Sequence, residues 1–158
     1  MTQSIVRRLG PYLGAFALAA GLAMVLAPAT PARAEIDPKY YREWQMKAPE
    51  ALVIRIGAVK PVVTSQRDRS GDGMLIRTRV EAEATVERIE RSASGLKPGD
   101  TIRIQYTSLR AEPPMAGPRP LPVLARGDIV PAFLIGVSKG LYAPAAQGAS
   151  FEPLIELR

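Results

Sequence analysis

Apolar and polar residues alternate over a long stretch in the middle of the chain, residues 74–90 (MLIRTRVEAEATVERIE). A period of two places every second side chain on the same face, which is typical of a β-strand with one face in a core and one in water. The stretch is long for one straight strand, so we expect it to bend around a barrel. The expected inner face holds Ile76, Thr78, Val80, Ala82, Ala84 and Val86, and the outer face holds Arg77, Arg79, Glu81, Glu83, Thr85 and Glu87.

Three further stretches predict strands that complete a sheet with residues 74–90. Residues 51–59 and 101–107 alternate in the same way, and residues 125–137 are apolar on both faces, which is typical of a central or covered strand. Pro131 interrupts the last stretch and has no N–H to donate. We therefore expect Pro131 at an edge or at a bulge.

The segment Lys97-Pro98-Gly99-Asp100 predicts a type II turn. Proline fits the fixed negative φ of the second position, and glycine fits the positive φ of the third. No helix with free amides is expected after this turn, so the segment is interpreted as a bend and not as an anion-binding loop.

The turn also predicts a register between the strand before it and the strand after it. Ile89 has the wrong parity to share the inner face with Val86, so we expect a bulge at Glu87-Arg88. The pairs expected on the core side are Ile102 with Ile89, Ile104 with Val86, and Tyr106 with Ala84. The pairs expected on the outer side are Arg103 with Glu87, Gln105 with Thr85, and Thr107 with Glu83.

A short helix is expected at the start of the fold, within residues 35–50. Asp37 is suited to the N-cap and Pro38 to the first helical position. Tyr40 and Trp44 fall one turn apart, either as an aromatic platform for a ligand or as rings that dock the helix onto the domain. Docking is the interpretation that we favour.

Two proline-containing segments follow the central strands. Residues 111–122 carry five prolines and predict a long, stiff loop. Within it, residues 119–122 (RPLP) resemble a polyproline ligand, although a loop that seals one end of a barrel explains them equally well. In the C-terminal segment, Tyr142 and Phe151 are the expected anchors.

The first 34 residues have the features of an export signal. Arg7 and Arg8 precede an apolar, uncharged run, and Ala32-Arg33-Ala34 supplies the small-x-small pattern of a cleavage site. We expect cleavage after Ala34 and a periplasmic or secreted protein. An uncleaved membrane anchor and export by the twin-arginine route are the alternatives.

Charge and composition exclude several classes of function. Of the 21 basic residues three lie before Glu35, so 18 basic residues face 15 acidic ones in the remaining 124 residues, a net charge of +3. This mild balance does not indicate nucleic-acid binding. The chain has no histidine and no cysteine, which excludes disulfides, the usual zinc and haem sites, a Ser-His triad and a thiolate nucleophile. We therefore expect no enzyme and no cofactor.

Two groups of oxygen ligands remain as candidate sites. Glu81 and Glu83 share a face but lie between arginines, so a solvated charge ladder is favoured over paired catalytic carboxylates. Asp68, Ser70 and Asp72 have the spacing that begins a calcium loop. The twelfth position, which should supply a bidentate glutamate, is Arg79. We therefore expect no metal site.

The order of these segments resembles the oligosaccharide/oligonucleotide-binding (OB) barrel of netrin modules and tissue inhibitors of metalloproteinases. The resemblance runs from ALVIRIGAV through GLKPGDTIRIQYTS to LPVLARGDIVPAFLIG and covers about residues 51–152. It implies a small barrel used for binding. The chelating N-terminal cysteine and the disulfides of those inhibitors are absent, so the resemblance does not extend to metalloprotease inhibition by that route.

Together these observations predict a mainly β fold: a signal peptide at 1–34, a short helix within 35–50 and a small five-stranded, OB-like antiparallel barrel over 51–158. The predicted function is that of an exported, non-enzymatic binding or interaction module with an unknown protein partner in the cell envelope. The alternative is a carrier or sensor for a small or anionic ligand, such as a glycan, bound in a groove of the barrel. No nucleic acid and no stable membrane insertion after cleavage are expected.

Overall fold

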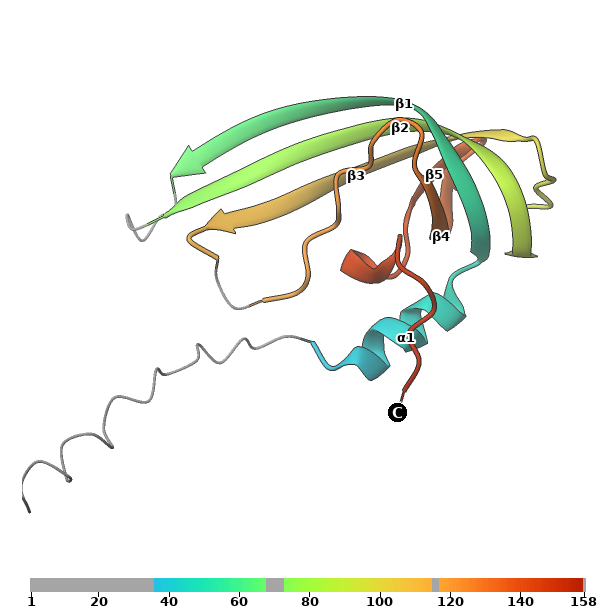
Figure 1. The fold of residues 1–158 in the computed structure, drawn as a ribbon, viewed down its shortest axis with the longest axis horizontal. Helices are drawn as coiled ribbons and strands as arrows, with labels where there is room; N and C mark the ends of the chain where they lie inside the picture. The colour runs from blue at the N-terminus through green and yellow to red at the C-terminus, as the bar shows by residue number, and fades with distance from the viewer. Residues whose placement is uncertain (1–35, 68–72, 115–116, 158) are drawn as a thin grey trace, which may run out of the picture. The chain divides into compact units, whose positions relative to one another are not determined.

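One helix and five strands form in the part of the chain that the computed structural model describes, residues 36–67, 73–114 and 117–157. The strands arch together over the helix and the C-terminal segment (Figure 1). The elements are α1 (Pro38–Lys47), β1 (Glu50–Arg67), β2 (Met74–Ser92), β3 (Thr101–Glu112), β4 (Ile129–Ser138), β5 (Leu141–Pro144) and a 3₁₀ turn (Gln147–Ala149).

The strands close into a barrel in the order β1-β2-β3-β5-β4. This confirms the predicted small, mainly β barrel with a short N-terminal helix. One detail differs from the prediction, because β3 and β5 run parallel while the other neighbouring strands are antiparallel. The long connection after β3 returns the chain to the start of β4, so the β4–β5 hairpin brings β5 beside β3 in the same direction.

The core lies inside the barrel and is built from the alternating apolar residues. Inner residues of all five strands are almost fully buried, and along β2 and β3 they alternate with mostly exposed neighbours. Tyr106 and Phe151 pack with their ring centroids 5.6 Å apart, so the C-terminal segment helps to fill the barrel. The buried strand residues of this core are Leu52, Ile54, Ile56, Val80, Ala82, Ala84, Val86, Ile102, Ile104, Tyr106, Ala132, Leu134 and Tyr142.

The predicted faces of β2 and β3 are right, but the predicted register is wrong, by five residues at Ile102 and by four at the other pairs. Ile104 lies opposite Ala82 and not Val86, and Arg103 lies opposite Glu83 and not Glu87. The error keeps the parity, so every inner residue stays inner. The complete set of pairs that replaces the predicted one is Ile102 with Ala84, Ile104 with Ala82, Tyr106 with Val80, Arg103 with Glu83, Gln105 with Glu81 and Thr107 with Arg79.

The register differs because the turn at Lys97–Asp100 does not join the strand ends directly. The turn itself is as predicted, since Asp100 N–H donates to the Lys97 carbonyl at 3.0 Å and Gly99 has a φ of +92°. However, Gly99 N–H donates to the carbonyl of Val86, in the interior of β2. The chain therefore folds back before β3 begins, and residues 87–92 pair with β1 alone.

The bulge expected at Glu87-Arg88 is present, but in the pairing of β2 with β1. Val53 lies opposite Arg88 and Ile54 opposite Val86, so Glu87 is the extra residue. Two further irregularities lie at Glu90 and at Gly57, and the one at Gly57 shifts β1 by one residue relative to β2. Such bulges let long strands bend around a barrel, as the length of β2 required.

Helix α1 packs through Tyr41 and Gln45, which are both fully buried. Asp37 caps the helix by accepting a hydrogen bond from Lys39 N–H, as predicted. The aromatic prediction is corrected in one respect, because Tyr40 is exposed while Tyr41 meets Trp44 edge to face at 5.5 Å. The helix is docked by the pair Tyr41 and Trp44.

The segment between β3 and β4 closes one end of the barrel. Tyr106 donates its hydroxyl proton to the carbonyl of Pro122 at 2.6 Å, and Ser108 donates to the carbonyl of Leu121. Leu124 is buried in the core. Pro131 pairs with Val53 of β1, while β5 pairs with β4 only from Leu134 onward, so the predicted edge position is confirmed.

Candidate functional site

The outward side of the β1-β2-β3 sheet gathers most of the charged side chains of the central strands. We call this side the outer face. Alternation along each strand and the observed register place its residues in rows that run across the three strands. Read from β1 through β2 to β3, the rows are Ala58–Glu83–Arg103, Lys60–Glu81–Gln105, Val62–Arg79–Thr107 and Thr64–Arg77–Leu109.

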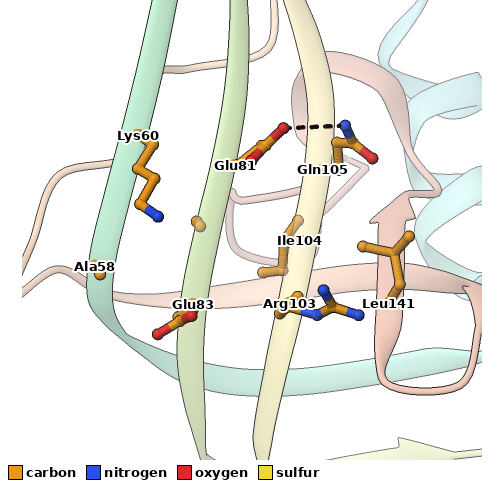
Figure 2. A pocket seen from close by; sticks show the side chains of 9 residues that line it. Ala58, Lys60, Glu81, Glu83, Arg103, Ile104, Gln105 and Leu141 are labelled. Carbon is orange, nitrogen blue, oxygen red and sulfur yellow. Dashed lines mark hydrogen bonds between the residues drawn. The ribbon is translucent and has the colours of Figure 1, made fainter.

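A hollow of about 360 Å³ lies over the two acidic rows, and Figure 2 shows its lining. We call it the Glu81–Glu83 hollow. Gln105 Nε2 donates to Glu81 Oε1 at 3.4 Å. Arg103 extends toward Leu141 and away from Glu83 in Figure 2. Among the described residues, neither carboxylate forms an ion pair within 4.0 Å.

A second hollow of about 490 Å³ lies over the two basic rows. We call it the Arg77–Arg79 hollow. Both guanidinium groups are exposed, and neither has a hydrogen bond or an ion pair with another described residue. Thr64 and Thr107 add hydroxyl groups, and Val62 and Leu109 add exposed apolar surface. This set of groups can bind an anion, because the arginine donors have no partner among the described residues.

The geometry of Glu81 and Glu83 fits a solvated charge ladder. Both side chains are exposed on the outer face of β2, between the basic residues Lys60 and Arg103 on the neighbouring strands. Exposed carboxylates in such a row interact with the neighbouring charges and with water. In the described part of the chain, no three acidic side chains come together to hold a metal ion.

Beyond the barrel, β1 and β3 each have a free edge. β4 pairs with β1 only over Glu50–Arg55, so residues 57–67 have β2 on one side and no described strand on the other. β5 pairs with β3 at Arg103 and Ile104 alone, which leaves residues 105–112 in the same situation. The three strands thus extend past the barrel as a sheet with two free edges, as the long arch of Figure 1 shows.

The hydrogen-bond pattern identifies which backbone groups face the free edge of β1. Val86 directs both its N–H and its C=O to the β3 side of β2, onto Asp100 and Gly99. Every second residue of an antiparallel strand directs its backbone groups to the same side, so the N–H and C=O groups of Val80 and Thr78 also point toward β3. Their partners Pro61 and Val63 in β1 therefore direct their backbone groups away from β2.

One buried carboxylate lies at the other end of β1. Glu50 is 1% exposed, and its Oε1 accepts from Ser94 N–H at 2.9 Å. Its Oε2 has no partner among the described residues. The hydroxyls of Ser94 and Tyr142 lie 2.9 Å apart nearby, so this group of polar residues ties the start of β1 to the segment after β2.

The RPLP segment is attached to the rest of the fold. Arg119 N–H donates to the Tyr41 hydroxyl at 2.9 Å, and its guanidinium pairs with Glu152 at 2.9 Å. Pro122 accepts the hydrogen bond from Tyr106. This arrangement corresponds to the sealing loop and not to a free polyproline ligand.

Two of the sequence predictions concern segments outside the described residues. The candidate calcium ligands Asp68, Ser70 and Asp72 lie there, and so does the expected signal peptide at 1–34. Within the described ranges, no helix is long and apolar enough to cross a membrane.

Comparison with protein-family models finds no match, and comparisons with curated proteins and with solved structures also find none.

Sequence reasoning did not anticipate the rows of the outer face or the burial of Gln45. The order Arg77, Arg79, Glu81, Glu83 is visible in the sequence, but only the correct register shows which side chains flank it. Gln45 gave no signal, because a lone glutamine in a short helix does not reveal that it is buried.

Proposed function

We propose that this protein is an exported, non-enzymatic binding module that binds a protein partner of the cell envelope at the free edge of β1. The observation that carries the proposal is the length of β1 beyond the barrel, residues 57–67, which has a described partner strand on one side only. An edge of this kind offers a row of backbone donors and acceptors to an added strand of another chain.

The side chains along this edge favour a partner over permanent exposure to water. Val62 is 59% exposed and Val63 is 65% exposed, and they lie on opposite faces of the edge strand. Natural edge strands are usually protected by charges, prolines or covering segments. Here Lys60 and Pro61 protect only the beginning of the free edge.

The test uses a photoreactive amino acid at Val63 in cells that export the protein. We expect a specific crosslinked partner from this position and none from Val137, which is 61% exposed on β4 and serves as the matched control. Identical partners from both positions would show non-specific apolar contact and contradict the proposal.

A backbone variant then tests strand addition itself. Because the Val63 N–H faces the free edge, Val63→Pro removes one donor without breaking the β1–β2 ladder. We expect Val63→Pro to lose the partner and Val63→Thr, which keeps the N–H, to retain it. Equal binding by both variants would exclude the edge as the binding element.

A carrier or sensor for an anionic ligand is the second candidate, and the Arg77–Arg79 hollow supports it. Two arginines that have no partner in the described part of the chain, together with two threonine hydroxyls, suit a sulfated or carboxylated glycan. Calorimetry with a sulfated oligosaccharide should show binding that Arg77→Gln/Arg79→Gln abolishes. The control Lys97→Gln/Arg126→Gln removes the same charge from exposed positions elsewhere and should retain binding.

A further inference from the structure

We propose that the outer face is also the interface of a symmetric dimer, in which the β2 strands of two copies cross in antiparallel directions near Val80. This inference is independent of the partner proposed for the β1 edge. It rests on the order of charges along one strand, the absence of ion pairs between these charges and other described residues, and the side chains that flank them.

The charges on the outer face of β2 are complementary to themselves when the strand is reversed. Outward from Val80, Arg79 and Arg77 follow in one direction, and Glu81 and Glu83 follow in the other. Consider a two-fold axis in the plane between the two faces that runs across the strands, at right angles to them. This axis places Arg79 over Glu81 of the second copy. The same axis places Arg77 over Glu83, so a dimer of this kind forms four ion pairs.

The flanking strands match under the same axis. Lys60 lies beside Glu81, so it comes over Val62 of the second copy, which lies beside Arg79. Arg103 lies beside Glu83 and comes over Leu109, which lies beside Arg77. Lysine and arginine cover apolar surface with their aliphatic stems while their charged ends stay in water. Val62 and Leu109, which are 59% and 47% exposed, would thus be covered.

The alternative face-to-face arrangement is excluded by charge. If the two-fold axis ran along the strands, the β2 strands would be parallel and Arg77 and Arg79 would each lie over an arginine. Like charges in direct opposition are unfavourable. The charge pattern therefore selects the antiparallel arrangement, and it also sets the register.

The four charged side chains are available for such contacts. Glu81, Glu83, Arg77 and Arg79 are all exposed and form no ion pair with another described residue. The two hollows alternate in the same way as the charges, so the Glu81–Glu83 hollow of one copy faces the Arg77–Arg79 hollow of the other.

The size of the face predicts a weak dimer. The four rows span seven residues along each of the three strands and measure roughly 23 Å by 15 Å, on the order of 350 Å² per copy, from a rise of about 3.3 Å per residue and a strand spacing of about 4.8 Å. Stable interfaces bury about 800 Å² per partner. A dissociation constant in the micromolar range, increased at high salt, is therefore expected.

The test is sedimentation equilibrium of the exported form with two charge variants. Arg77→Glu/Arg79→Glu makes the outer face of β2 wholly acidic, and Glu81→Arg/Glu83→Arg makes it wholly basic. We expect the unmodified protein to dimerise, each variant alone to be monomeric at the same concentration, and the two variants mixed to form a heterodimer. The quadruple variant, which reverses the pattern, should dimerise again.

Several results would overturn the proposal. One is that the unmodified protein stays monomeric at several hundred micromolar and low salt. The others are that neither variant disrupts the dimer, or that the two variants do not associate when they are mixed. If an anion-binding site is the only role of Arg77 and Arg79, the variants change ligand binding and leave the mass unchanged. Thermal melts of each variant verify folding. If a double or quadruple variant does not fold, the milder single variants Arg79→Gln and Glu81→Gln repeat the test.

Discussion

Gln45 and Ile155 lie 110 residues apart in the sequence, and the side-chain amide oxygen of Gln45 accepts a hydrogen bond from the backbone N–H of Ile155 at 3.0 Å. The amide nitrogen of the same side chain donates to the carbonyl of Ala149 at 2.9 Å, and it also contacts the carbonyls of Glu152 and Pro153. Gln45 thus holds the C-terminal segment against α1, and it does so while fully buried.

Gln45→Ala should destabilise the protein by about 2–4 kcal/mol, because it removes several hydrogen bonds and leaves buried backbone groups without partners. Urea unfolding followed by the fluorescence of Trp44, the single tryptophan of the chain, measures this change. Met46→Ala is the control, since Met46 is 52% exposed on the same helix and should change stability by less than about 0.5 kcal/mol. Equal effects of the two substitutions would mean that the hydrogen bonds of Gln45 contribute nothing to stability.

Tyr106 should make the stability depend on alkaline pH. Its burial raises its pKa to about 12 from an ordinary value of 10.0, although the hydrogen bond with Leu124 N–H opposes this shift. A folded-state pKa above the unfolded value contributes stability that is fully present below pH 10 and is lost as the pH rises toward about 12. The loss should reach at most about 3 kcal/mol relative to Tyr106→Phe, which has no proton to lose.

Near neutral pH the unmodified protein should be more stable than Tyr106→Phe, whereas near pH 12 it should be less stable. Tyr106→Phe should be less stable by about 1 kcal/mol, because the hydroxyl donates to the Pro122 carbonyl in the unmodified protein. Urea unfolding of both proteins at a series of pH values checks both effects. A constant difference between them up to pH 12 would contradict the raised pKa.

The sequence was sufficient to predict the faces of the strands, and it was not sufficient to predict their register. Alternation assigns Ile102 and Ile104 to the core because a wrong parity would bury Arg103. Register depends instead on where the connecting chain folds back, and the hydrogen bond from Gly99 to the middle of β2 is a tertiary contact that no local pattern contains.

The lengths of β1 and β3 were also underestimated, with consequences for the candidate site. Alternation after Gly57 changes phase at the bulge, so residues 60–67 did not extend the predicted strand 51–59. The free edge of β1 lies in this extension. The charges of the outer face were predicted correctly as solvated, but their cross-strand neighbours changed with the register.

Gly99→Ala should destabilise the protein by about 1–2 kcal/mol, because Gly99 has a φ of +92°, a region that is unfavourable for residues with a Cβ atom. The space around it is open, so no steric clash adds to this effect. Gly117→Ala is the matched control, since its surroundings are equally open and its φ is not positive. Thermal or urea unfolding of both variants measures the cost of placing a Cβ atom at a positive φ. Equal stabilities of the two variants would show that this cost is absent.

Gly148→Ala should disrupt the contact between the C-terminal segment and the loop that seals the barrel. A Cβ atom at this position would lie 2.5 Å from both the Cβ and the carbonyl oxygen of Arg119, and the backbone of Arg119 is fixed by its hydrogen bond to Tyr41. We expect a loss of about 2–4 kcal/mol, since the overlap involves backbone and not a flexible side-chain end.

Gly136→Ala provides the matched control for Gly148→Ala. A Cβ atom there meets only Cε1 of Tyr142 at 3.9 Å, which is an ordinary contact, so the change in stability should stay within about 0.5 kcal/mol. Arg119 lies over the ring of Tyr41, which in turn meets Trp44, so Gly148→Ala should also alter the tryptophan emission of the folded protein. Unchanged emission together with unchanged stability would show that Arg119 is not held against Gly148, because a loop free to move aside relieves the overlap without loss of free energy.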